Sequence, residues 1–71
     1  MSNAVECYSG SRYAERPTAV VWEGQRLAVQ EILGGWRVPD GMRFKVIAGD
    51  GLVFELVYDE AHDDWKVKQI E

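Results

Sequence analysis

Residues Met42 to Tyr58 read MRFKVIAGDGLVFELVY, and this stretch decides the fold. Runs rich in Val, Ile, Phe and Tyr flank the tripeptide Gly49-Asp50-Gly51. Aromatic and β-branched residues favour strands, and a short Gly/Asp segment between two such runs is typical of a hairpin turn. The sequence therefore predicts a β-hairpin at the centre of the domain.

The register of this hairpin follows from the faces that each loop length would create. A two-residue loop would set Val46 against Glu55 and mix apolar with charged side chains on one face. A three-residue loop, formed by a type I turn followed by Gly51 in the left-handed conformation, separates them. Its pairs are Phe44 with Leu56, Val46 with Phe54, Met42 with Tyr58 and Lys45 with Glu55. Because a one-residue slip sends every side chain to the opposite face, this consistency favours the three-residue loop.

The composition predicts a single small domain that spans residues 5–71. A chain of 71 residues buries only about 60% of its unfolded surface. Three Trp, three Tyr and two Phe supply large apolar areas for its core. We expect Met1 to Ala4 to be a disordered tail or a scar left by cloning, since Ser-Asn-Ala is small and polar.

The cysteine content, the lengths of the apolar runs and the net charge together predict a soluble cytoplasmic protein. The single Cys7 cannot form an internal disulfide, so a reducing, cytoplasmic location is expected. No apolar run approaches the roughly 20 residues of a membrane span, and no signal peptide is evident at the N-terminus. The net charge of −4 argues against a protein that coats nucleic acid with its whole surface.

Upstream of the central hairpin we expect two further strand pairings. Val5 to Ser9 alternates apolar and polar residues and predicts a first strand, and Ser9 to Pro17 is a connection. Thr18 to Glu23 and Arg26 to Leu33 predict a hairpin with a two-residue loop at Glu23-Gly24, which places Val20 opposite Leu27.

The second strand of that hairpin changes phase after Val29, because the next apolar residues are Ile32 and Leu33. A helical turn over residues 27–33 and a bulged, bent strand both fit this spacing. We favour the bent strand, since such a bend curls a small sheet into a barrel. Gly34 to Gly41, GGWRVPDG, has the composition of an irregular loop around Trp36.

The last strand, Trp65 to Ile70, follows an acidic turn whose loop is Glu60 to Asp63. Together with the central hairpin it forms a three-stranded meander with two defined faces. The inner face has the rows Met42-Tyr58-Trp65, Phe44-Leu56-Val67 and Val46-Phe54-Gln69. The outer face has the rows Arg43-Val57-Lys66, Lys45-Glu55-Lys68 and Ile47-Val53-Ile70.

The outer face carries a basic strip. Four of the eight basic residues lie in its rows, opposed only by Glu55; they are Arg43, Lys45, Lys66 and Lys68. Such a strip can follow a phosphate backbone, with Arg37 and Trp36 as neighbouring guanidinium and stacking groups. An ordinary solvated face, whose lysines discourage strands from pairing edge to edge, is the alternative.

An apolar row crosses the same face. Ile47, Val53 and Ile70 are either covered by the first strand or by the connection to Pro17, or they mark a protein contact. Trp36 is either a lid on the barrel or an aromatic that binds a partner.

No catalytic or metal constellation emerges. The turn with Asp59, Glu60, Asp63 and Asp64 around His62 lacks the spacing of a calcium loop or a zinc motif. Cys7 has only His62 as a prospective base, and the glycines of the central turn join two strands rather than a strand and a helix. We expect no cofactor, no metal and no enzymatic activity.

The chain from Tyr8 to Ile70 resembles a small bacterial β-domain family of unknown function. The pattern comprises Arg16-Pro17, Trp22-x-Gly24, Val29-x-x-Ile32-Leu33-x-x-Trp36, Phe44-x-Val46, Asp50-Gly51, Phe54-Glu55-Leu56, Asp59 and Trp65. Members of that kind are similar to domains loosely associated with error-prone DNA polymerase components. The resemblance implies a DNA-repair context and brings no catalytic residues. Some relatives have a longer loop after the tryptophan that matches Trp36, whereas this chain is short there.

The fold expected from the sequence is an all-β antiparallel roll or SH3-like barrel of five or six strands. The first functional hypothesis is a non-enzymatic protein-interaction module that contacts an unknown partner, or a second copy of itself, through Ile47, Val53, Ile70 or Trp36. The second is an accessory domain that contacts nucleic acid through Arg43, Lys45, Lys66, Lys68 and Arg37.

Overall fold

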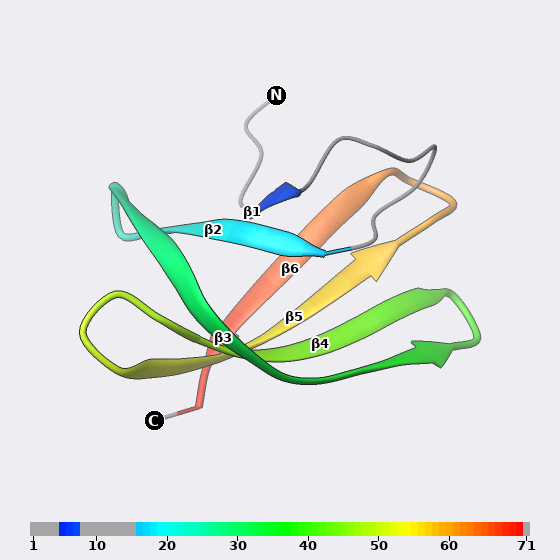
Figure 1. Cartoon of the computed structure of the whole chain (residues 1–71). Helices are drawn as coiled ribbons and strands as arrows, with labels where there is room; N and C mark the ends of the chain where they lie inside the picture. Colours follow the sequence, from blue (N-terminus) through cyan, green and yellow to red (C-terminus); the bar gives the residue numbers. More distant parts are fainter. Residues whose placement is uncertain (1–4, 8–15, 71) are drawn as a thin grey trace.

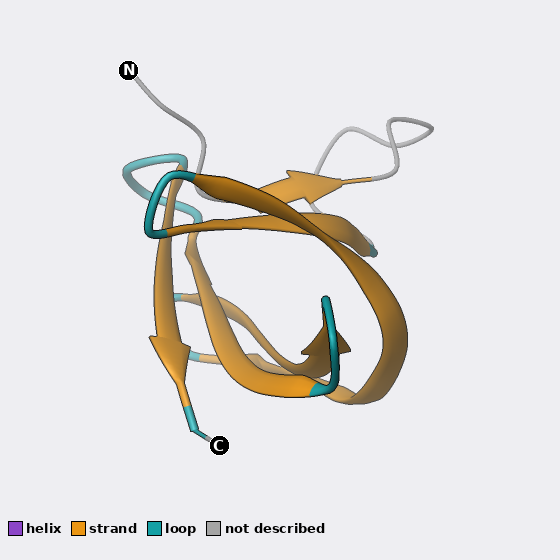
Figure 2. Cartoon of the chain, turned by 90° about the vertical axis from the view of Figure 1, so that its left-hand side faces the viewer, coloured by secondary structure: helices purple, strands orange, loops and turns teal. Residues whose placement is uncertain are grey.

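Six strands follow one another in a single antiparallel meander, in the order of the sequence. The computed structural model describes residues 5–7 and 16–70. Its strands are β1 (Val5–Cys7), β2 (Pro17–Trp22), β3 (Gln25–Val38), β4 (Gly41–Ala48), β5 (Leu52–Asp59) and β6 (Asp64–Gln69). Figures 1 and 2 show the sheet curled into an open half-barrel. The described residues contain no helix, and the predicted small antiparallel all-β roll is confirmed.

All three predicted hairpin registers are confirmed. In β4 and β5, Val46 pairs with Phe54 and Lys45 with Glu55, as the three-residue loop requires. In β2 and β3, the Val20–Leu27 pair follows from the two-residue loop. In β5 and β6 the pairs are Phe54–Gln69, Glu55–Lys68, Leu56–Val67, Val57–Lys66 and Tyr58–Trp65. The two faces of the meander are therefore those derived from the sequence.

The turn at the tip of β4 and β5 has the predicted length but a different conformation. Gly51 has the expected positive φ of 99°, but Gly49 also has a positive φ, 62°. A type I turn needs a negative φ at that position, so the predicted type I turn was wrong. Glycine adopts positive and negative φ with little steric difference, so residue 49 was compatible both with a type I turn and with the observed turn.

Strand β3 is long and sharply bent. Its pairing with β4 shifts at two places, between Val29 and Glu31 and between Ile32 and Gly34. Such bulges insert an extra residue and increase the local bend, so β3 leaves β2 and continues beside β4. The bent strand predicted for residues 27–33 is confirmed and the alternative helical turn is wrong.

The irregular loop predicted for Gly34 to Gly41 was wrong, because β3 runs to Val38 and only Pro39 and Asp40 remain in the turn. The glycines there allow close packing within a strand. A Cβ on Gly35 would lie 2.8 Å from the Phe44 ring, so the absent side chain makes room for that ring. Glycine in a strand interior often marks such a close approach.

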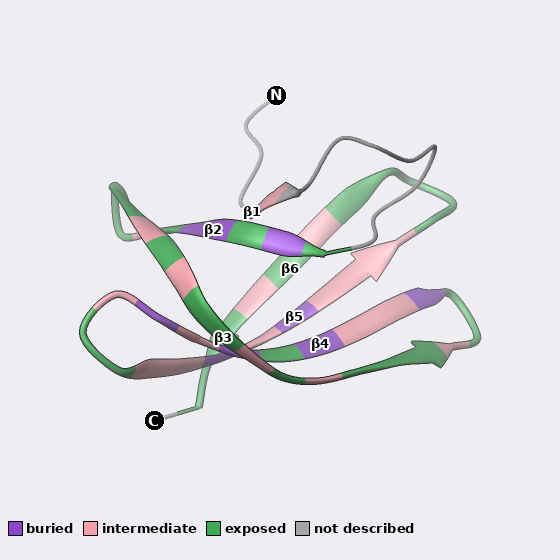
Figure 3. Ribbon diagram, viewed as in Figure 1, coloured by how far each residue is buried: buried purple, intermediate pink, exposed green. Residues whose placement is uncertain are grey.

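The core lies on the concave side of the curled sheet. Figure 3 shows its buried segments in β2, β4 and β5. The completely buried Phe54 meets Trp22 edge to face, with ring centroids 5.4 Å apart, and Trp65 packs against Tyr58 at 5.0 Å. The buried core residues are Val5, Val20, Phe44, Val46, Ala48, Phe54 and Leu56.

The first strand pairs with β2 and brings Val5 into the core, where only 4% of that side chain is exposed. On its other side, Glu6 forms a two-pronged ion pair with Arg26, at 2.8 and 2.9 Å. The predicted strand extended to Ser9 and was followed by a connection to Pro17, and residues 8–15 of this stretch lie outside the described residues, as does the tail at 1–4.

Candidate interaction surface

The outward side chains of β3 to β6 form one continuous surface, which we call the outer face. The pairing extends the predicted rows by one strand, because Trp36 pairs with Arg43 and Gly34 with Lys45. The outer face therefore consists of Trp36, Arg43, Val57, Lys66, Gly34, Lys45, Glu55, Lys68, Ile47, Val53, Ile70 and Glu31, which pairs with Ile47. None of these residues belongs to the hydrophobic core cluster.

The basic strip on the outer face is only partly neutralised. The Arg43 Nε lies 3.5 Å from the Glu55 carboxylate, without the geometry of a hydrogen bond. Lys45, Lys66 and Lys68 are exposed and form no ion pair with any described residue. Because exposed ammonium groups attract anions at little desolvation cost, these lysines give the face an excess of positive potential.

Arg37 does not join this strip. It pairs with Met42, whose side chain packs against the core, so Arg37 lies on the other side of the sheet from Trp36. Its guanidinium binds Glu60 at 2.9 Å and approaches the Met42 sulfur at 3.5 Å. The predicted grouping of Arg37 with the basic strip was wrong, because a continuous strand alternates its side chains between faces.

Trp36 is the largest apolar group on the outer face. It lies within β3 rather than in a loop, and 44% of it is exposed. A Cβ on Gly34 would lie 3.1 Å from the Trp36 ring, so the ring lies over the bare backbone of Gly34, next to Lys45 in the pairing. This position places Trp36 outside the core, and the lid interpretation does not apply.

The apolar row lies on the outer face as predicted. Ile47 and Val53 are paired and partly exposed, and the Ile70 amide donates to the Val53 carbonyl at 2.7 Å. Ile70 remains 41% exposed. The sequence suggested two segments that could cover this row, the first strand and the connection from Ser9 to Pro17. The first strand, β1, pairs with β2. Of the connection, the structure describes only Arg16 and Pro17.

Two features were missed from the sequence. Leu33 lies at the second irregularity of β3 and is 45% exposed, and its signal was the phase change after Val29. The Glu6–Arg26 ion pair links β1 to β3 across β2, and no local pattern indicates it. The hydrogen bond from Arg26 holds the pKa of Glu6 below its ordinary value.

The acidic turn is organised by its own hydrogen bonds. Asp59 accepts hydrogen bonds from the amides of Ala61 and His62, and its other oxygen lies 2.9 Å from the His62 ring nitrogen Nδ1. The contact with the His62 side chain is the main reason that the pKa of Asp59 is lowered. The Tyr58 hydroxyl donates to Asp63 at 2.6 Å. Among the described residues, no three His, Cys, Asp or Glu side chains are grouped so that they could hold a metal ion.

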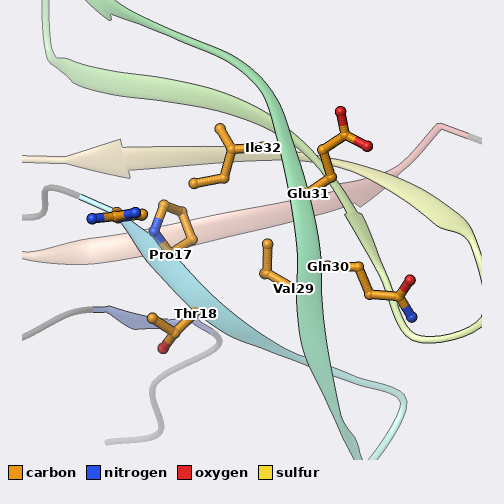
Figure 4. A pocket seen from close by; sticks show the side chains of 7 residues that line it. Pro17, Thr18, Val29, Gln30, Glu31 and Ile32 are labelled. Atoms are coloured by element: carbon orange, nitrogen blue, oxygen red, sulfur yellow. The ribbon is translucent and has the colours of Figure 1, made fainter.

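Two of the grooves that are lined by described residues open beside the core. One, of about 320 Å³, occupies the fork where β3 leaves β2, and Figure 4 shows Ile32 and Val29 on the β2 side of β3, facing Pro17. Arg16 and Glu31 bring opposite charges to its rim. The other, of about 500 Å³, lies between the tips of two hairpins and is lined by Trp22, Glu23, Gln25, Leu27, Gly49, Asp50, Leu52 and Gln69. The lining of both grooves is continuous with the core and contains no histidine or cysteine.

No family model, curated protein or solved structure matches the chain. No helix among the described residues has the length and apolar character needed to cross a membrane.

Proposed function

We propose that the protein is a non-enzymatic interaction module that binds an acidic surface of a protein partner through its outer face. The observation that carries this proposal is the exposure of two large apolar side chains, Trp36 at 44% and Ile70 at 41%, beside the three exposed lysines of the basic strip. Tryptophan is enriched among residues that dominate binding energy.

The arrangement of the face suggests what the partner must offer. Trp36 is on β3, in the same row as Lys66, and Ile70 follows β6. The two apolar groups are therefore three strand spacings apart across the sheet, about 14 Å, and four residues apart along it. The basic strip lies between them. A partner with carboxylates between two apolar recesses would complement both features, and opposite charge would accelerate the encounter. A cytoplasmic location and an SH3-like kind of half-barrel are part of the same proposal.

A display library of random peptides tests this proposal and does not require the partner to be identified. Peptides selected on the wild-type protein should be rich in Asp and Glu together with apolar residues. We expect Trp36→Ala, and separately Lys45→Glu with Lys66→Glu, to weaken binding by about tenfold or more, since loss of a central contact costs about 1.4 kcal/mol or more. Titration of labelled peptides followed by fluorescence anisotropy measures the effect.

The matched control is Val21→Ala, because Val21 is 37% exposed but lies on β2, away from the outer face. This variant should bind the peptides as the wild type does. Peptides that bind all the variants equally, or a selection that yields no binder, would contradict the proposal.

The second candidate function is contact with single-stranded nucleic acid in a DNA-repair context. It is favoured by the position of the exposed Trp36 ring beside Arg43 and Lys45, since stacking on aromatics and phosphate contacts commonly occur together in such sites. Binding of single-stranded DNA at low salt that weakens steeply with added salt and with Lys45→Glu would support this function over the first. Absence of binding at low salt would remove it.

A further inference from the structure

Strand β6 is a free edge of the sheet in the part of the chain that the structure describes. It pairs with β5 on one side, and it is the last strand of the meander, so no described strand pairs with its other side. An edge strand exposes a row of unpaired backbone N–H and C=O groups that can pair with another chain.

The free backbone groups can be assigned by parity. The Ile70 amide donates to Val53 of β5, and alternate residues of an antiparallel strand point their backbone groups to the same side. The backbone groups of Lys66 and Lys68 therefore face β5. Those of Trp65, Val67 and Gln69 face away from it.

The side chains along this edge alternate in character. Lys66 and Lys68 are exposed on the outer face, while Trp65 and Val67 pack against the core and are only partly covered. A strand added beside β6 would extend the existing rows. Its outward residues would lie next to lysines, and its inward residues next to Trp65 and Val67.

We propose that β6 accepts an extended segment of a partner protein as an additional strand, and that this segment alternates acidic and apolar residues. Opposite charges on neighbouring strands stabilise a pair, and apolar residues beside Trp65 and Val67 would cover what the edge leaves exposed. The proposal rests on the proposed function only in requiring that the protein acts by binding a partner. The edge shares Lys66 and Lys68 with the outer face but does not include Trp36, which lies on β3.

A second copy of the chain is a poorer occupant of this edge. Antiparallel pairing of two β6 strands that uses all three free-edge residues, Trp65, Val67 and Gln69, centres on Val67. It sets Lys66 of one copy against Lys68 of the other. Like charges directly opposite each other destabilise a strand pair. The charge of the edge therefore favours an acidic segment over self-association.

The test uses a synthetic peptide in which valine and glutamate alternate, labelled for fluorescence anisotropy. We expect saturable binding to the full chain. A matched peptide with lysine in place of glutamate should bind at least about tenfold more weakly, and so should one whose alternate backbone amides are methylated so that they cannot pair with a strand. Equal binding of the methylated peptide, or no binding of the parent peptide, would overturn the proposal.

Proline variants of the protein locate the contact. Val67→Pro removes a free-edge amide without removing a bond to β5, and proline is tolerated at such positions of edge strands. It should weaken peptide binding by about tenfold or more, and Gln69→Pro is the milder variant should Val67→Pro fail to fold. Unchanged binding by a folded proline variant would contradict the edge site.

Trp36→Ala separates this proposal from the proposed function. The alternating peptide should bind this variant as it binds the wild type, because Trp36 lies on β3. If the alternating peptide binds at β6 but Trp36→Ala weakens the binding of no library peptide, the edge site is supported and the outer-face function is contradicted. If Trp36→Ala weakens the binding of library peptides but the alternating peptide does not bind, the outer-face function is supported and the edge site is contradicted.

Discussion

Replacing Gly41 with alanine is expected to destabilise the protein more than any other exchange of a glycine for alanine in the described residues. A Cβ at this position would lie 1.9 Å from the Tyr58 carbonyl oxygen and 2.9 Å from its carbon. Both are backbone atoms of β5, the strand that pairs with β4, so they cannot move without disrupting the hairpin. We expect a loss of about 4 kcal/mol or more, a large share of the stability of a small domain.

Gly51→Ala is the matched control for this prediction. Gly51 has a positive φ of 99°, but a Cβ there would meet no atom within 4 Å. Its replacement should therefore cost only the backbone strain of about 1–2 kcal/mol. Urea unfolding followed by tryptophan fluorescence measures both variants, and equal losses would contradict the close approach of β4 and β5 at Gly41.

Phe54→Ala is expected to have the second largest effect. Phe54 is completely buried and its ring packs edge to face on Trp22, at an interplanar angle of 64°. Truncation removes this contact and leaves a cavity at the centre of the half-barrel. Losses of about 3–5 kcal/mol are typical of a buried phenylalanine.

The adjacent residue provides the control for Phe54. Val53 is next to it in β5, but it pairs with Ile47 on the outer face and does not belong to the core cluster. We expect Val53→Ala to cost less than about 1 kcal/mol. Circular dichroism during chemical denaturation measures both changes, and a Val53→Ala loss as large as that of Phe54→Ala would mean that the faces of β5 are reversed.

The registers of the hairpins were predictable because two constraints agreed. Strand side chains alternate with a period of two, and each loop length permits only one set of pairs. In the central hairpin, only the three-residue loop places Phe44, Val46 and Phe54 on one face. The same agreement fixed the faces of β6 and hence most of the outer face.

The part of the outer face on β3 could not be predicted, because glycine occurs both in turns and within strands where a neighbouring side chain packs closely against the backbone. Gly34 and Gly35 resemble turn residues, but within β3 they make room for the rings of Trp36 and Phe44. A single sequence does not distinguish these roles, since the contacting rings belong to tertiary structure. The predicted grouping of Arg37 with the basic strip was wrong for the same reason, because an irregular loop does not define on which side of the sheet Arg37 lies.

Contacts between distant strands were also beyond local patterns. The ion pair between Glu6 and Arg26 depends on β1 lying beside β2, which no spacing in the sequence indicates. The free edge at β6 depends on the same ordering of the strands. The sequence provided the residues of the candidate surface, and the curling of the sheet determined which of them lie together.

The central claim is that residues of β6 alternate. One set directs its backbone to β5 and its side chains to the outer face, and the other directs its backbone to the free edge and its side chains to the core. Amide hydrogen exchange along β6 tests this claim most directly. We expect alternating protection, with slow exchange at Lys66, Lys68 and Ile70, whose amides face β5, and fast exchange at Trp65, Val67 and Gln69. Equal protection at all six amides, or the reverse alternation, would contradict it.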